Sequence, residues 1–247
     1  MRAAAAALVA ALGFAGCGGG DSDRLRLTVS AAQSLKAPFE QYGSSFAGAD
    51  VRFSFAGSGE LAAQIRQGVK PDVYAAADPD LPEQLFGEGL VERPVEFAAG
   101  RLVIAVPRES EVDRIEDLAE PGTRLVLGAR EVPVGAYARQ ALDRLPTRTR
   151  QAILATVRSE EPDVAGIVGK LTQGAADAGF LYATDLRPLG GRLVAVELPP
   201  RLRPRVRYAA AVVVGAAQPG TARRFVQGLV RGAGRRALGR AGFEAPG

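Results

Sequence analysis

The sequence has no histidine and only one cysteine among its 247 residues. These two shortages exclude a histidine-dependent catalytic triad, a histidine metal site, a CxxC redox pair and an internal disulfide. No GxxxxGK[ST] segment occurs either, so a P-loop nucleotide site is not indicated. The sequence therefore lacks the residues for several common types of enzyme chemistry.

What the chain does contain is ordinary for a globular protein with a proper core. Hydrophobic residues make up 47% of it and charged residues 23%. A length of 247 residues suits one large domain or two lobes.

The N-terminus has the pattern of an export signal. An apolar stretch over residues 3–14 and two small residues precede Cys17, so residues 1–16 are predicted to be a signal peptide. The placing of Cys17 resembles a bacterial lipobox, in which this cysteine is lipidated and becomes the first mature residue. Residues 17–23 would then be a flexible tether, and the protein would be extracytoplasmic, either anchored to the outer face of the cell membrane or periplasmic. An ordinary secretory signal with cleavage nearby is the alternative.

Short β-like runs alternate with amphipathic helical patterns from residue 25 onward, which indicates an α/β fold. Two strongly apolar strands, at residues 101–106 and 208–214, are suited to crossing between two lobes and back. The expected division is a first lobe over residues 24–100, a second lobe over 101–207, and a return to the first lobe over 208–247. Other expected elements are strands at 25–29, 51–55, 72–78, 124–127 and 178–182, and helices at 34–46, 135–145, 163–172 and 221–239.

Four short stretches place hydroxyl or bare backbone N–H groups at expected strand-to-helix turns. The first N–H groups of a helix lack intrahelical partners, and the helix dipole adds positive charge there, so converging helix starts attract anions. Ligands of open sheets lie beyond the carboxyl ends of strands, which is where Ser34 and Ser58 fall. Taken alone, both serines could equally be N-caps of their own helices. The stretches are Ala32-Gln33-Ser34, Gly57-Ser58-Gly59, Val132-Pro133-Val134-Gly135 and Glu161-Pro162-Asp163-Val164.

Five sequence blocks, in order, resemble the molybdate-binding proteins of bacterial ABC importers, the ModA family. The match runs through nearly the whole mature chain. The blocks are Ala31-Ala32-Gln33-Ser34-Leu35, Phe55-Ala56-Gly57-Ser58-Gly59-Glu60-Leu61-Ala62, Pro71-Asp72-Val73 with Ala76-Ala77-Asp78, Val132-Pro133-Val134-Gly135-Ala136-Tyr137-Ala138, and Ala178-Gly179-Phe180-Leu181-Tyr182-Ala183-Thr184-Asp185.

The resemblance implies a type II periplasmic-binding-protein fold: two lobes, each a mixed sheet flanked by helices, joined by a two-strand hinge. It implies no catalysis, no cofactor and no direct metal-cation ligand, but capture of molybdate or tungstate between the lobes and delivery to an ABC permease by a monomer. Ser34 and Ser58 would donate through hydroxyl and backbone groups, Tyr182 through its phenol, and Val134 and Val164 through backbone N–H groups.

Two residues near the expected site need separate comment, one for its role and one for its orientation. Tyr182 could also be a core aromatic at the end of a strand. The carboxylate of Glu60 would repel a dianion, so we expect it to point away from the cleft, although its place in a first helical turn suits the helix dipole.

The sequence pI near 9.6 invites a nucleic-acid function. The arginines at 201, 203, 205 and 207 alternate as on an exposed strand or loop, and those between 223 and 240 have no interleaved aromatic platform. A solvated basic face fits better than a nucleic-acid site. Attraction to anionic lipid headgroups or to the permease is the remaining use of this charge.

Two alternatives stay open. One is a binding protein for another tetrahedral oxyanion, such as sulfate, phosphate or thiosulfate. The other is an exported hydrolase with Ser58 or Ser34 as nucleophile. The hydrolase lacks any histidine base, and Ala56 stands where a GxSxG elbow needs its first glycine.

Overall fold

The computed structural model describes residues 25–246. The predicted signal peptide, Cys17 and the predicted tether at 17–23 lie outside the described residues. Within residues 25–246, no helix has the length and apolar character needed to cross a membrane.

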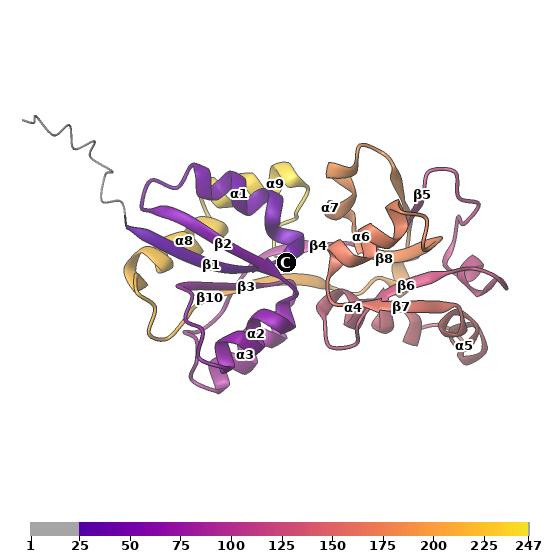
Figure 1. The fold of residues 1–247 in the computed structure, drawn as a ribbon, viewed down its shortest axis with the longest axis horizontal. Helices are drawn as coiled ribbons and strands as arrows, with labels where there is room; N and C mark the ends of the chain where they lie inside the picture. Colours follow the sequence, from indigo (N-terminus) through magenta and orange to yellow (C-terminus); the bar gives the residue numbers. More distant parts are fainter. Residues whose placement is uncertain (1–24, 247) are drawn as a thin grey trace, which may run out of the picture.

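Two lobes lie side by side, each built on a five-stranded sheet (Figure 1). Lobe 1 carries the sheet β2-β1-β3-β10-β4, in which β1 runs parallel to β2 and β3 while β10 is antiparallel to β3 and β4. Its strands are β1 (Arg26–Ala32), β2 (Asp50–Ala56), β3 (Val73–Ala76), β4 (Val95–Gly100) and β10 (Val206–Val212).

Lobe 2 repeats this arrangement with the sheet β7-β6-β8-β5-β9. Here β6 is parallel to β7 and β8, and β5 is antiparallel to β8 and β9. Both sheets are therefore mixed, as predicted. The strands of lobe 2 are β5 (Leu102–Pro107), β6 (Leu125–Gly128), β7 (Val157–Glu161), β8 (Ala178–Tyr182) and β9 (Leu193–Glu197).

Helices cover both faces of each sheet (Figure 1). In lobe 1, α1 (Lys36–Ser44), α8 (Pro219–Val230) and α9 (Ala233–Ala241) pack on one face, and α2 (Ser58–Arg66) and α3 (Asp80–Gly87) on the other. In lobe 2, α4 (Pro133–Asp143) and α5 (Thr147–Ala155) lie opposite α6 (Val164–Thr172) and α7 (Ala183–Leu186). Short 3-10 turns complete the fold: η1 (Gln33–Leu35), η2 (Ile115–Ala119), η3 (Arg187–Leu189) and η4 (Pro200–Leu202).

The chain crosses between the lobes in short segments rather than inside continuous strands. β4 ends at Gly100 in one sheet and β5 begins at Leu102 in the other, so the first crossing takes place at Arg101. The second lies in residues 203–205, between η4 and β10. The expected strands at 101–106 and 208–214 each stay in one lobe because β5 finds its ladder partners only in β8 and β9, and β10 only in β3 and β4.

A single buried cluster of apolar side chains continues through both lobes. Lobe 1 contributes aromatic rings such as Phe39, which lies 5.9 Å from Phe225 between ring centroids. The two lobes meet at Tyr208 of β10 and Tyr182 of β8, whose rings stand edge-on at 5.7 Å. This shared core holds the lobes together beside the crossing segments.

The predicted C-terminal helix at 221–239 is wrong in its continuity, because the chain forms two helices with a break at Arg231 and Gly232. Gly232 has φ of 127°, a conformation that a residue with a side chain rarely adopts. Phe225 and Leu229 of α8 are buried in lobe 1, whereas Val230 is 36% exposed.

Candidate functional site

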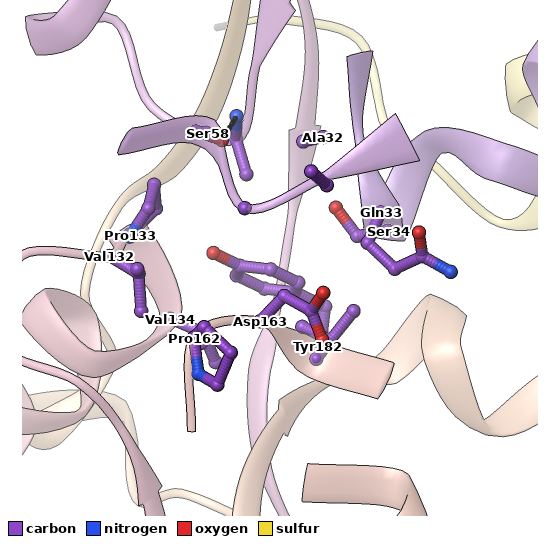
Figure 2. A pocket seen from close by; sticks show the side chains of 14 residues that line it. Ala32, Gln33, Ser34, Ser58, Val132, Pro133, Val134, Pro162, Asp163 and Tyr182 are labelled. Carbon is purple, nitrogen blue, oxygen red and sulfur yellow. Dashed lines mark hydrogen bonds between the residues drawn. The ribbon is translucent and has the colours of Figure 1, made fainter. Parts of the chain in front are cut away.

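The carboxyl ends of strands from both sheets face each other across a small cavity between the lobes. Figure 2 shows residues of lobe 1, among them Ser34 and Ser58, across this space from Pro133, Val134 and Asp163 of lobe 2. The cavity is lined by Ala32, Gln33, Ser34, Ala56, Gly57, Ser58, Ala77, Val132, Pro133, Val134, Pro162, Asp163, Val164 and Tyr182. The structure thus brings all five predicted site residues to one place: Ser34, Ser58, Val134, Val164 and Tyr182.

Ser34 follows β1 in the turn η1. Its Oγ atom is buried and has no hydrogen-bond partner within the described part of the chain. The N-cap of η1 is Ala32 and makes no side-chain bond, so the alternative role of Ser34 as a helix cap is wrong. A buried hydroxyl without a partner costs free energy, and a ligand that accepts its proton would relieve that cost.

Ser58 follows β2 and is the first residue of α2. Gly57, not Ser58, is the N-cap of that helix, so the capping alternative is wrong here too. The Ser58 Oγ instead accepts a hydrogen bond from the Ala77 N–H at 3.1 Å, and the Ser58 carbonyl accepts one from the Tyr74 hydroxyl at 2.8 Å. Since its oxygen already accepts, the Ser58 hydroxyl has its own proton left to donate.

Tyr182 ends β8 and is fully buried. Its ring packs edge-on against Tyr137 and Tyr208, so it is a core aromatic as well as a lining residue. Its hydroxyl has no hydrogen-bond partner among the described residues. Burial raises the pKa of Tyr182 well above its ordinary value, which keeps the phenol protonated as a donor.

Helix α4 starts at the cavity wall, with Pro133 as its first residue. Val134 is the second residue, so its N–H lies too early in the helix to have an intrahelical partner. A Cβ on Gly135 would lie 2.0 Å from the carbonyl oxygen of Ala129, and one on Gly128 would lie 2.6 Å from a methyl of Val134. Glycine at these positions lets the helix start press directly against the end of β6.

Helix α6 starts at the same cavity and is capped by Asp163. The Asp163 carboxylate accepts a hydrogen bond from the Gly166 N–H at 2.9 Å. Val164, the first residue of the helix, keeps an N–H that intrahelical bonding does not use. The positive ends of two helix dipoles thus lie at one wall of the cavity.

No lysine or arginine is among the residues that line the cavity, and Asp163 is the one charged side chain among them. The Glu60 carboxylate lies outside the lining, as predicted: Glu60 is exposed and accepts a hydrogen bond from Gln64 Nε2 at 3.2 Å. Positive potential at the cavity therefore comes from backbone dipoles and polar hydrogens.

Two carboxyls lie close behind the site, the buried Asp78 and the half-buried Asp185. Burial raises the pKa of Asp78 to about 6 and that of Asp185 to about 7. Asp78 accepts a hydrogen bond from the Leu81 N–H at the start of α3, and Asp185 accepts one from the Tyr182 N–H. Both groups are held protonated more readily than an exposed aspartate.

The site lacks the arrangement that a nucleophile needs. Neither serine hydroxyl is hydrogen-bonded to a side chain that could take its proton. Over residues 25–246, no group of three or more His, Cys, Asp and Glu side chains is gathered as a metal ion would require. Capture of a small anion is the chemistry that this donor set can perform.

Some of the lining was not singled out from the sequence. Ala77 holds Ser58 through its N–H, and Gly57 and Pro162 touch across the cavity: a Cβ on Gly57 would lie 2.4 Å from the Pro162 carbonyl oxygen. Gly57 and Pro162 belong to turns noted in the sequence, but no local pattern predicts that they meet.

Two α/β lobes around a small cavity lined by hydroxyl groups and helix starts define a two-lobed ligand-binding protein. Comparison with known proteins makes the class specific. The chain belongs to the family of bacterial extracellular solute-binding proteins, which it matches over residues 27–244.

The molybdate-binding protein ModA of Mycobacterium tuberculosis is 34% identical over 227 residues, covering 89% of this chain and 85% of that protein. The periplasmic molybdate-binding protein of Azotobacter vinelandii has the same fold, with a TM-score of 0.78 and 22% identity over 90% of this chain and all of that one. The sulfate-binding protein SubI of M. tuberculosis also shares the fold, at a TM-score of 0.75 and 16% identity over 90% of this chain and 87% of that one. The two-lobed fold is thus confirmed, and the hydrolase alternative is not favoured.

Proposed function

We propose that this protein captures molybdate in the cavity between its lobes and delivers it to an ABC permease, with tungstate as a second ligand. The observation that carries the proposal is a pair of buried hydroxyls, on Ser34 and Tyr182, that have no partner within residues 25–246 and line a cavity without cationic side chains. The 34% identity to the M. tuberculosis molybdate-binding protein supports molybdate over sulfate.

Five donor groups would hold the anion. Ser34, Ser58 and Tyr182 would give their hydroxyl protons, and Val134 and Val164 their backbone N–H groups. Hydrogen bonds to a charged group contribute on the order of 1.5–3 kcal/mol each, so together they offset much of the cost of removing water from a dianion.

The donors also give a basis for selection. The five proposed donors favour an anion whose oxygens all accept hydrogen bonds, and the Ser58 oxygen already accepts one from the Ala77 N–H, so these groups offer little to the extra proton of hydrogen phosphate. Tetrahedral oxyanions without a proton, and of a size that lets the lobes close, are the favoured class.

The proposal includes the setting in which capture takes place. Export by the signal at residues 1–16 and lipidation at Cys17 would hold a monomer at the outer face of the cell membrane, near its permease. Residues 25–100 and 206–246 would move as one unit and residues 102–202 as the other, with the crossing segments at Arg101 and residues 203–205 as the hinge. The boundary expected between residues 207 and 208 thus falls two residues earlier, because Val206 and Arg207 pair with β4.

Thermal unfolding of the purified protein in molybdate, tungstate, sulfate, phosphate and buffer alone tests the proposal. A ligand at about a hundred times its dissociation constant adds roughly 2.7 kcal/mol to the free energy of unfolding. We expect molybdate and tungstate to stabilise the protein, and sulfate and phosphate to leave it unchanged. An equal response to sulfate would reassign the ligand, and no response to any anion would contradict the proposal.

A further inference from the structure

We propose that Gly57 determines how tightly the cleft shuts, because its contact with the Pro162 carbonyl of the other lobe forms a seal between the lobes. This inference rests on the proposed function, since closure over an anion is what the seal would serve. Gly57 acts here through the fit between the lobes and donates nothing to the ligand.

The position of the contact follows from the sheet order. β2 and β7 are edge strands of their sheets, on the side away from β10, β4, β5 and β9, where the chain crosses between the lobes. Gly57 comes directly after β2, and Pro162 directly after β7. When two lobes rotate about their crossing segments, the turns farthest from those segments move most and meet last.

The backbone of Gly57 does not itself require glycine. Its φ of −61° and ψ of 138° are ordinary extended values that any residue adopts. An N-cap position accepts residues with side chains, so lobe 1 alone gives no reason for glycine here.

The packing against lobe 2, in contrast, does require glycine at position 57. A Cβ on Gly57 would lie 2.4 Å from the Pro162 carbonyl oxygen, a separation that real Cβ atoms essentially never show. The obstructing atom belongs to the backbone at the start of α6, which Asp163 caps, so it cannot swing away as a flexible side chain would. A side chain at position 57 must therefore keep the lobes apart.

Separation of the lobes would weaken binding without removing a donor. Ser34 and Ser58 stand on lobe 1, and Val134, Val164 and Tyr182 on lobe 2, so one anion reaches all five only when the lobes are shut. A bound anion would also lose its enclosure and dissociate sooner. The effect should thus be seen mainly in the dissociation rate.

The test compares Gly57→Ala with Gly59→Ala in the purified protein. Gly59 is the second residue of α2, and its Cβ would stand 3.4 Å from the Glu131 carbonyl oxygen, an ordinary van der Waals contact. Molybdate, tungstate and sulfate are titrated into both variants and the wild type, and dissociation rates are measured by stopped flow. Thermal unfolding without ligand and small-angle scattering with ligand complete the comparison.

We expect Gly57→Ala to raise the dissociation constant about tenfold to a hundredfold, as overpacking of this size does. Its ligand-free unfolding midpoint should stay near that of the wild type, and its liganded form should scatter as a more open particle. Gly59→Ala should bind within about twofold of the wild type.

The outcomes separate the two proposals. A wild type that binds sulfate but not molybdate contradicts the proposed ligand. The seal is then tested by the ratio of the sulfate dissociation constants of Gly57→Ala and the wild type. Equal affinity of Gly57→Ala and wild type overturns the seal while the proposed function stands. A ligand-free Gly57→Ala that unfolds far below the wild type also overturns it, because Gly57 would then serve the fold of lobe 1. A wild type that binds no anion overturns both.

Discussion

The two lobes share one strand order but present their donors in different ways. Lobe 1 brings hydroxyl side chains, Ser34 and Ser58, at the ends of β1 and β2. Lobe 2 brings the starts of two helices, at Val134 and Val164, and adds the Tyr182 phenol. Substitutions therefore test lobe 1 by deleting a donor, whereas most of lobe 2 can be tested only by moving a helix.

The largest effect is expected where a lobe 2 helix is displaced. In Gly135→Ala the new Cβ would lie 2.0 Å from the Ala129 carbonyl oxygen, so α4 must move off β6. We expect the free energy of unfolding to fall by about 3 kcal/mol or more, with loss of anion binding. Chemical denaturation and calorimetric titration measure both.

Gly169→Ala is the matched control in the other lobe 2 helix. The nearest atom to its Cβ would be Gln173 Nε2, at 3.9 Å. This variant should be as stable as the wild type or up to about 1 kcal/mol more stable, because alanine favours a helix interior. Equal behaviour of the Gly135→Ala and Gly169→Ala variants would contradict the role given to the β6–α4 packing.

The two serines of lobe 1 should differ from each other. Ser58→Ala leaves the Ala77 N–H without its partner, so the ligand-free protein should lose about 1–2 kcal/mol of unfolding free energy. Ser34→Ala removes a hydroxyl that has no partner among the described residues, so its ligand-free stability should be unchanged. Both should raise the dissociation constant for molybdate about tenfold to a hundredfold. Equal ligand-free unfolding midpoints for the two variants would contradict the expected difference in stability between Ser58→Ala and Ser34→Ala.

Tyr182→Phe tests the one side-chain donor of lobe 2. The ring packing against Tyr137 and Tyr208 is kept, and the lost hydroxyl has no partner within residues 25–246. We expect unchanged or slightly higher ligand-free stability and about tenfold weaker molybdate binding, by titration calorimetry. Tyr42→Phe, which loses a hydroxyl bonded to the Phe225 carbonyl in lobe 1, is the control and should bind normally. Normal molybdate affinity in Tyr182→Phe would mean that the Tyr182 hydroxyl does not donate to the ligand.

Two substitutions of Asp163 separate the effect of its negative charge on binding from its role as the N-cap of α6. Asp163→Ala should cost about 1 kcal/mol of stability because α6 loses its N-cap. Asp163→Asn keeps an acceptor for the Gly166 N–H and removes a negative charge, so it should keep its stability and bind molybdate more tightly. Weaker binding in Asp163→Asn would mean that the carboxylate itself helps to place the ligand.

A pH dependence of stability is expected from the carboxyls behind the site. The pKa of Asp185 is about 7 in the folded protein against an ordinary 3.8, so the folded form holds this proton more tightly than the unfolded form does. Stability should therefore fall as pH rises from 5.5 to about 7. Asp78, with its pKa raised to about 6, adds to this trend.

Thermal unfolding at pH 5.5, 6.5 and 7.5 measures the trend. Asp185→Asn should reduce the slope between these points, because the titrating group is gone. Asp143→Asn changes an exposed carboxylate of lobe 2 and should keep the wild-type slope. A wild type whose stability rises with pH across this range would contradict the raised pKa values.

The elements found from the sequence are those with strong apolar periodicity. The strand predicted at 178–182 is β8 itself, and the strands predicted at 25–29 and 51–55 lie largely within β1 and β2. β7 was not predicted, because Val157–Glu161 is a polar edge strand without an apolar run. α5 was missed for a related reason: only Ile153 in it is buried. β4, β9 and α3 also lacked a pattern strong enough to predict.

The site was predictable only in part from the residues themselves. The serines could be placed at strand ends by periodicity, but Val134 and Val164 have side chains that say nothing about anions. They entered through the resemblance to molybdate-binding proteins. The contact of Gly57 with Pro162 joins two turns far apart in sequence, and only the three-dimensional arrangement of the lobes shows it.

The most direct test of the central claim is a crystal structure of the protein grown with molybdate, with anomalous diffraction used to locate the molybdenum. The account predicts one strong anomalous peak in the cavity between the lobes, with hydrogen bonds from Ser34, Ser58 and Tyr182 and no arginine or lysine in contact. A peak against the surface arginines, or no peak between the lobes, would contradict it.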